Sequence, residues 1–205
     1  MHVDERTLDK ALAESTATSE LIASTLGTEA ALNRIERLAV ASLNICLEHR
    51  EATLLLAAHG ARASAFAMMR PLFEACVRGC WIGFVANDQQ IDLMFAGKLS
   101  TKLELMAREV GRREPALKGI ESIASAYKQR LDDFTHGSGA QLARWYSHEA
   151  IGPRHSPGEV IDVLRFVDSV GLIACVAREK LCQRPTAPFL ERLRQAATPE
   201  RKGPS

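Results

Sequence analysis

The sequence predicts an all-α protein, a single-domain helical bundle of about 5–7 helices. Three observations support this prediction. Alanine and leucine, both strong helix formers, are abundant. Alternating β-branched patterns are rare and no Asn-Gly hairpin signal occurs. Apolar residues recur instead at the three- and four-residue spacing of helices, and 205 residues suit one domain with a substantial core.

Two long helices are expected in the first third of the chain. The first covers Glu5–Leu26, and Thr28 is the expected N-cap of the second, which covers 29–58. Gly60 is expected to close the second helix, because glycine readily adopts the left-handed backbone conformation that ends helices.

Two further helices are expected in the middle of the chain, over 61–86 and 91–110, with the turn "NDQQ" between them. Pro71 lies inside the first of these segments and lacks a backbone donor. It should therefore kink that helix or mark a restart. The segment "GRREPALKG" is expected to be a charged loop.

The C-terminal half is expected to add two long helices. The first is 120–135, which carries a clean apolar face, and the second is 157–181, with Ser156 as N-cap and Pro157 at its first position. Shorter helical pieces are expected over 141–147 and 189–197. The bundle domain is expected to cover residues 1–185, and residues 186–205 are expected to hold the last short amphipathic piece and a disordered tail.

Composition limits the classes of partner and the compartment. A formal net charge of +1 gives no overall attraction to nucleic acid or membrane. The N-terminus has no apolar signal core, and charges interrupt both long apolar stretches, so we expect no membrane association. An odd number of cysteines, five, indicates a reducing, cytoplasmic location.

No cofactor and no metal site are predicted. Cys76 and Cys80 lie one helical turn apart and could hold a metal ion in principle. The favoured interpretation is that both are small buried apolar side chains, because no other cluster of ligands lies nearby in the sequence.

The stretch "AFAMMRPLFEACVRGCWIGFV" (65–85) is apolar at nearly every position, yet it carries Arg70, Glu74 and Arg78 at intervals of four residues. These charges must lie along one side of a helix, where Glu74 can bridge both arginines. We call these three residues the charged seam. A surplus of one guanidinium predicts a pocket that accepts an anion. The alternative is a structural ion-pair ladder that an acid of a neighbouring helix closes, such as Asp132, Asp162 or Asp168.

The stretch "RLDDFTHGSG" (130–139) places His136 directly after an apolar helical face and before a glycine-rich turn. Histidine transfers protons near neutral pH, and Asp132, one turn earlier, could orient the imidazole. Gly137 is grouped with the charged seam as a ligand-binding residue. The alternative is that His136 only satisfies the last carbonyls of the helix. His155, beside Arg154, is kept as a further contact for an anion.

The two stretches together resemble an uncharacterised bacterial helical family, over roughly residues 30–180. The resemblance rests on an Arg-x-x-x-Glu-x-x-x-Arg-x-x-Trp helix followed by a His-Gly turn with a second glycine. The matching positions here are Arg70, Glu74, Arg78, Trp81, His136, Gly137 and Gly139. The resemblance implies no activity.

More remotely, Arg130 and His136 match the Arg-x(4–6)-His pattern of HEPN domains, which are helical bundles and often metal-independent ribonucleases in toxin–antitoxin and phage-defence systems. That resemblance implies a homodimer with a composite site that cleaves RNA. His136 would move the proton and Arg130 would hold the phosphate. The sequence departs from the pattern at Leu131, where a polar residue is usual. On a straight helix the six-residue interval also turns the two side chains about 120° apart.

Two functions follow as hypotheses. The first is a ribonuclease or toxin-type effector that uses His136 and Arg130, with Arg70 or Arg78 on the phosphate and Asp132 or Glu74 as the orienting acid. The second is a non-catalytic module that binds a nucleotide, another small anion or a protein partner. Sequence-specific DNA binding is not expected, because no basic patch is interleaved with aromatic residues.

Overall fold

A computed structural model describes residues 5–27, 31–135, 142–146, 151–152 and 155–197, with the backbone alone for 128–135. The described chain is all-α, and Tyr146 and Ile151 form an isolated β-bridge. The elements in order are α1 (Glu5–Thr25), α2 (Arg34–Ala58), α3 (Arg62–Ala67), α4 (Met69–Phe84), α5 (Asp88–Phe95), α6 (Leu103–Arg113), the 3-10 turn η1 (Pro115–Leu117), α7 (Gly119–Thr135), α9 (Pro157–Leu181) and α10 (Ala187–Ala197). The predicted all-α helical bundle is confirmed.

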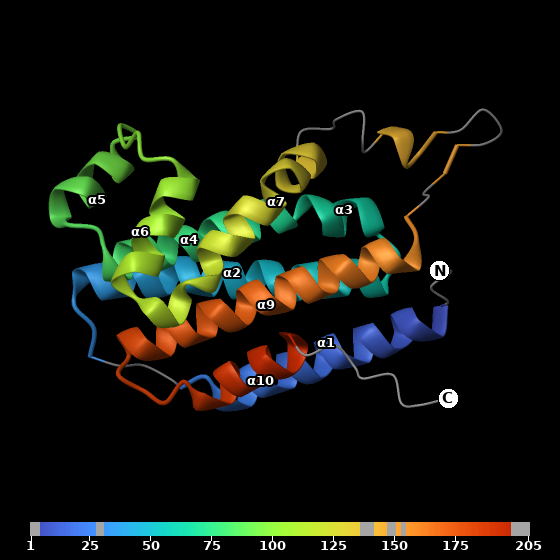
Figure 1. Cartoon of the computed structure of the whole chain (residues 1–205), viewed down its shortest axis with the longest axis horizontal. Coiled ribbons are helices and arrows are strands. Elements are labelled where there is room, and N and C mark those ends of the chain that lie inside the picture. Colours follow the sequence, from blue (N-terminus) through green and yellow to red (C-terminus); the bar gives the residue numbers. More distant parts are fainter. Residues whose placement is uncertain (1–4, 28–30, 136–141, 147–150, 153–154, 198–205) are drawn as a thin grey trace.

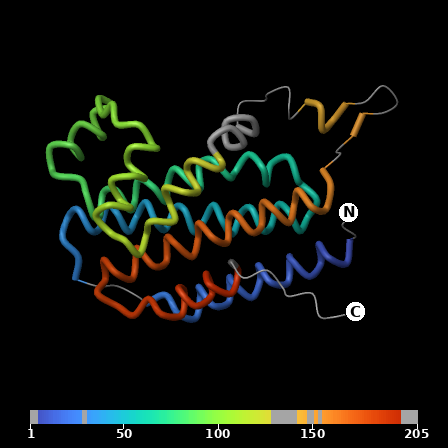
Figure 2. Tube along the Cα trace, viewed as in Figure 1, coloured from blue at the N-terminus to red at the C-terminus, as the bar shows by residue number. Residues whose placement is uncertain are grey.

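Helix α9 runs through the middle of the bundle, between α1 and α10 on one side and α2, α4 and α7 on the other (Figure 1). Most of its side chains from Val160 to Leu181 are buried, which is consistent with its central place in the bundle. The helices at the two ends of the described chain, α1 and α10, lie side by side (Figure 2). There Arg192 Nη2 donates to the carbonyl oxygen of Glu14 at 2.9 Å. Among the described residues, no helix combines the length and apolar character needed to cross a membrane.

Helices α2 and α4 pack closely because α4 presents two glycines to its neighbours. A Cβ atom added at Gly79 would lie 2.8 Å from Cγ of Leu43, and one added at Gly83 would lie 2.8 Å from Cδ1 of Leu181. Both distances are shorter than real Cβ contacts allow. At Gly79 the Ala39 backbone oxygen also lies 3.1 Å from the added atom, so a larger residue there would push α2 away from α4. One face of α4 is therefore fixed against α2 and the end of α9.

Local capping sets the ends of the long helices. Ser156 and Glu159 form a reciprocal capping box at the start of α9, which confirms the predicted start at Pro157. Gly60, with φ of +75°, ends α2 as expected. The expected start of α2 is wrong: the helix begins at Arg34 because Asn33 forms a capping box there, whereas Thr28 lies outside the described residues.

The segment predicted as one helix over 61–86 is divided into α3 and α4 at Met68. Pro71 lies in the first turn of α4, where backbone N–H groups lack acceptors within the helix, so proline costs little there. The restart that Pro71 predicted is confirmed.

The helix predicted over 91–110 is wrong. The stretch "NDQQ" starts α5, because Asn87 and Gln90 form a capping box. Helix α5 then ends before Gly97, whose φ of +66° belongs to the left-handed region, and α6 starts only at Leu103. The predicted charged loop after residue 110 is instead the end of α6 followed by η1.

A buried ionic network joins α1, α2 and α9 around Arg50, whose side chain is fully buried. Its Nε and Nη2 donate to Oδ1 of Asp168 at 2.9 and 2.6 Å. Nη1 donates to the Ser19 hydroxyl at 2.6 Å and to Glu51, and Nη2 also donates to the Ser15 carbonyl oxygen at 2.6 Å. All five N–H donors of this guanidinium can thus be satisfied, as a buried cation requires.

We predict that Arg50→Ala lowers the free energy of unfolding by about 3–5 kcal/mol, because it leaves Asp168 buried without its cation. Arg50→Lys should also lose stability, since an ammonium cannot present five donors in this planar arrangement. Urea unfolding followed by circular dichroism measures both variants. Arg165→Ala, at an exposed position of α9, is the control and should change stability by no more than about 0.5 kcal/mol. A loss below about 1 kcal/mol for Arg50→Ala would contradict this account of the network.

Candidate functional site

The charged seam lies along one side of α4, with Glu74 between the two arginines. Nε of Arg70 donates to Oε1 of Glu74 at 2.8 Å, and Nη2 of Arg78 lies 3.0 Å from Oε2 of Glu74. The side chains of Arg70, Glu74 and Arg78 are 30%, 22% and 51% exposed. The seam is therefore neither deeply buried nor free in solvent. It follows the one part of α4 that the core does not cover.

The seam forms part of the lining of a pocket of about 470 Å³. This volume lies within the range of about 300–1,000 Å³ that is usual for small-molecule sites. The remaining lining comes from the end of α5, the α5–α6 loop and the first turns of α6, namely Met94, Gly97, Leu99, Thr101, Leu103 and Met106. The pocket thus combines a charged side on α4 with residues of the α5–α6 hairpin.

Polar contacts from α4 and from α2 reach the hairpin. Nε1 of the fully buried Trp81 donates to Oε2 of Glu109 at 2.8 Å, which joins α4 to α6 directly beside the seam. At the outer side, Arg34 pairs with Asp88 and Asp92 at 3.1 and 3.0 Å, which joins α2 to α5. The tryptophan of the Arg-x-x-x-Glu-x-x-x-Arg-x-x-Trp pattern therefore positions one wall of the pocket.

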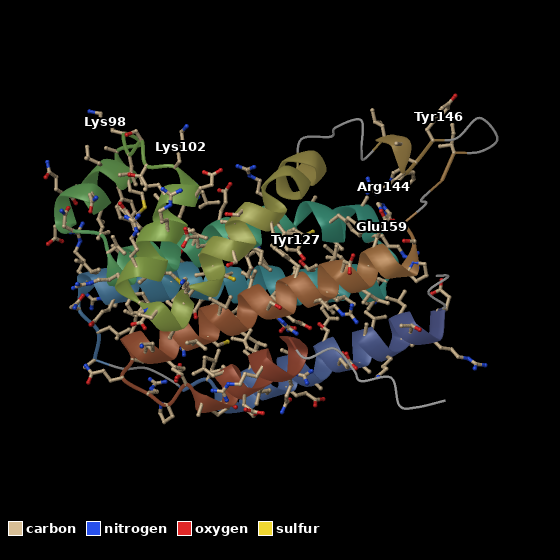
Figure 3. The ribbon with its side chains drawn as sticks, in the orientation of Figure 1. Lys98, Lys102, Tyr127, Arg144, Tyr146 and Glu159 are labelled. Carbon is tan, nitrogen blue, oxygen red and sulfur yellow. The ribbon has the colours of Figure 1, made fainter. Side chains whose placement is uncertain are left out.

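The pocket carries positive charge. Its ionised lining residues are two arginines and one glutamate, which leaves a surplus of one positive charge. Within the part of the chain that the structure describes, Arg78 uses only Nη2 in an ion pair, and no partner binds its Nε or Nη1. Lys98 and Lys102, both exposed, lie at the outer end of the α5–α6 loop, which lines the pocket (Figure 3). An anion that enters the pocket would therefore meet a half-exposed guanidinium with donors available.

The predicted histidine site lies largely beyond what the structure describes. His136 and Gly137 lie outside the described residues, and Arg130 and Asp132 belong to the last turns of α7, where only the backbone is described. The roles given to these four residues stay predictions. Asp168, one of the acids expected to close a structural ladder on the seam, instead binds Arg50.

His155 is a second polar group that is buried in the described structure. The side chain is 4% exposed and its ring lies 4.7 Å from the ring of Phe66, centroid to centroid. Among the described residues neither Nδ1 nor Nε2 has a hydrogen-bond partner, while the backbone oxygen accepts from Arg62. Burial lowers the pKa of His155, with Arg144 and Arg62 adding to the effect and Glu159 opposing it. His155 is therefore a neutral imidazole near pH 7.

Four of the five cysteines are buried in the core, away from solvent. Cys46, Cys76, Cys80 and Cys175 are buried free thiols on α2, α4 and α9. Burial raises the pKa of Cys46 and Cys175, the latter to about 12, and Cys76 Sγ donates to the Val170 carbonyl oxygen at 3.7 Å. In the described ranges no three His, Cys, Asp or Glu side chains are grouped as a metal site would need.

Sequence reasoning identified the seam but missed the residues opposite it. Met94, Leu99 and Leu103 were assigned to a single continuous helix, which cannot fold back to form a wall. The signal that could have found the hairpin is "AGKLST" (96–101), where a glycine follows the end of an apolar helical pattern. Glu109, the acceptor for Trp81, carried no sequence signal.

Comparison with known proteins gives one result. A family model described as a family of unknown function (DUF6988) matches residues 43–196, from within α2 to the end of α10. No curated protein and no solved structure matches the chain. The expected resemblance to a family without known activity is confirmed, and the matched segment includes the whole charged seam and its pocket.

We predict that His155 makes the protein less stable in mild acid. The unfolded chain binds a proton at this residue near pH 6.5, whereas the folded protein binds it only at lower pH. The free energy of unfolding is therefore unaffected by this residue at pH 8 and falls as the pH drops below 6.5. His155→Phe keeps an aromatic ring against Phe66 and should reduce the loss of stability between pH 8 and pH 5, measured by urea unfolding.

The control is Leu55→Phe at a 60% exposed position of α2, which leaves His155 in place and should show the same loss between pH 8 and pH 5 as the natural protein. An equal acid-induced loss in His155→Phe and in the natural protein would refute the proposed burial of a neutral imidazole.

Proposed function

The chain belongs to DUF6988, a family of unknown function, and we propose that it binds a small anionic ligand in the pocket between α4 and the α5–α6 hairpin. The observation that carries the proposal is the half-exposed Arg78, which lines a pocket of about 470 Å³ and has donors available. Glu74 pairs with Arg70 at 2.8 Å and with Arg78 at 3.0 Å, so the two guanidiniums share one carboxylate.

The arrangement suits binding better than simple stabilisation of the helix. A pair at i and i+4 on a solvated helix face contributes only about 0.2–0.5 kcal/mol. The two pairs around Glu74 therefore add little to a helix that is already held by its apolar faces. The bundle's buried ionic network, around Arg50, is satisfied within the protein, whereas Arg78 keeps donors available.

Several features outside the seam support the same proposal. The start of α6 lies at the pocket, because Thr101 and Leu103 line it, so the positive end of the helix dipole lies at the site. The loop that contributes Gly97, Leu99 and Thr101 also carries Lys98 and Lys102, which raise the local positive potential. These contributions attract an anion without selecting its chemical class.

We predict that Arg78→Gln weakens anion binding by about tenfold or more, because a hydrogen bond to a charged group contributes about 1.5–3 kcal/mol. The probes are sodium salts of phosphate, acetate, hexanoate and adenosine monophosphate, each titrated by calorimetry and by thermal shift. A ligand that binds only the folded protein raises its melting temperature.

The matched control is Arg165→Gln, which makes the same change of charge at an exposed position of α9 outside the pocket. It should bind as the natural protein does. Equal affinity in Arg78→Gln and Arg165→Gln, or no binding of any probe to the natural protein, would exclude the pocket as an anion site.

The ribonuclease hypothesis is tested in parallel. HEPN-type cleavage, the homodimer that its composite site needs and a role in phage defence depend on His136, which lies outside the described residues. Incubation of single-stranded RNA with the natural protein and with His136→Ala distinguishes the two functions. Cleavage that disappears in His136→Ala would favour the nuclease, whereas binding without cleavage favours the module.

A further inference from the structure

The two sides of the pocket differ in chemistry. The α4 side carries the charged seam. The hairpin side carries four large apolar side chains, Met94, Leu99, Leu103 and Met106, with Gly97 and Thr101 between them. Met106 is buried, and the other three are half-buried. A ligand that fills the pocket therefore meets guanidinium on one side and hydrocarbon on the other.

This lining disfavours inorganic oxyanions and nucleotides as ligands. Phosphate or sulfate could bind Arg78 but would leave the apolar side chains in contact with water, so most of the pocket would contribute nothing. A nucleotide would find no aromatic ring among the lining residues on which to stack its base. Thr101 is the only side-chain hydroxyl among those residues to receive its ribose.

The charge of the lining favours a monoanion. Arg78 shares the carboxylate of Glu74 with Arg70, so a single carboxylate from a ligand would complete the pairing of the Arg78 guanidinium. A carboxylate also fits the fork of a guanidinium through two parallel hydrogen bonds. Within the described chain Nη2 of Arg78 contacts Glu74, and it carries two N–H groups. Its second N–H can form such a fork together with the N–H of Nε or of Nη1.

We infer that the ligand is a monocarboxylic acid with a compact apolar body. Its carboxylate binds Arg78, and its apolar body packs against Met94, Leu99, Leu103 and Met106. This inference rests on the proposed function and specifies the class of its ligand. The two methionines suit such a role because their flexible thioethers adapt to bodies of different shape.

The test is a series of straight-chain acids with a constant head group. Acetate, butyrate, hexanoate and octanoate are titrated calorimetrically into the full-length protein. Each added methylene should tighten binding about fourfold until the chain fills the pocket, because that fold-change corresponds to about 0.8 kcal/mol for each buried methylene. Hexanol and hexanamide, which lack the charge, should bind at least about tenfold more weakly than hexanoate.

Two variants test the contact with the ligand's carboxylate and the contact with its apolar body separately. Arg78→Gln should weaken every acid by a similar factor and leave the dependence on chain length unchanged. Leu99→Ser, in the loop, should reduce the gain per methylene and weaken octanoate by a larger factor than acetate. Leu55→Ser, at a 60% exposed position of α2, is the matched control and should behave as the natural protein. Melting curves verify that each variant is folded. The dependence of affinity on chain length in the natural protein tests the inference without any variant.

The outcomes distinguish the inference from the proposed function. If acetate or phosphate binds as tightly as hexanoate and binding depends on Arg78, the proposed anion site is supported. The inference that the ligand has an apolar body is then refuted. If hexanol binds as tightly as hexanoate, the recognition of a carboxylate is wrong. If no acid and no phosphate binds, the proposed function itself fails, and the inference fails with it.

Discussion

The burial of α4 is the constraint on which the rest of the structure depends. Gly79 and Gly83 bring α2 and the end of α9 against one face of this helix, and Trp81 fixes α6 beside another through Glu109. A charge on a helix enclosed in this way must either be paired inside the protein or lie where no neighbour covers it. The charged seam occupies this remaining face, and the α5–α6 hairpin extends over it and turns an exposed stripe into the side of a pocket.

The protein contains two groups of arginine and carboxylate with opposite characters. Around Arg50 the guanidinium is fully buried, and its partners come from three helices, so the network fixes how those helices pack. Along the seam, both ion pairs lie within α4, and Arg78 is half exposed. A closed network stabilises one arrangement of the chain, whereas the open one can take up a ligand. The Arg50 guanidinium is buried with a partner for each donor, whereas Arg78 is half exposed with donors available. This difference is the physical reason for assigning the anion site to the seam.

The sequence predicted those features that depend on neighbouring residues. The start of α9 could be predicted because Ser156 and Pro157 are local capping signals, and the seam because its three charges recur at four-residue intervals. The Arg50 network could not be predicted, since Asp168 lies 118 positions away and nothing in the sequence links the two. The hairpin opposite the seam was missed because the apolar pattern continues across Gly97, where the left-handed backbone ends α5.

The most direct test of the central claim, that an anion binds the charged seam, is a titration that observes the guanidiniums themselves. We propose ¹H–¹⁵N spectra of the arginine Nε–H groups during the addition of hexanoate, with assignments from Arg70→Gln, Arg78→Gln and Arg165→Gln. The account predicts that the Nε–H signal of Arg78 shifts and saturates at the same acid concentrations as the calorimetric binding curve, while that of Arg165 stays in place. Saturable binding of hexanoate with no change at Arg78 would contradict the account, because the acid would then occupy some other part of the protein.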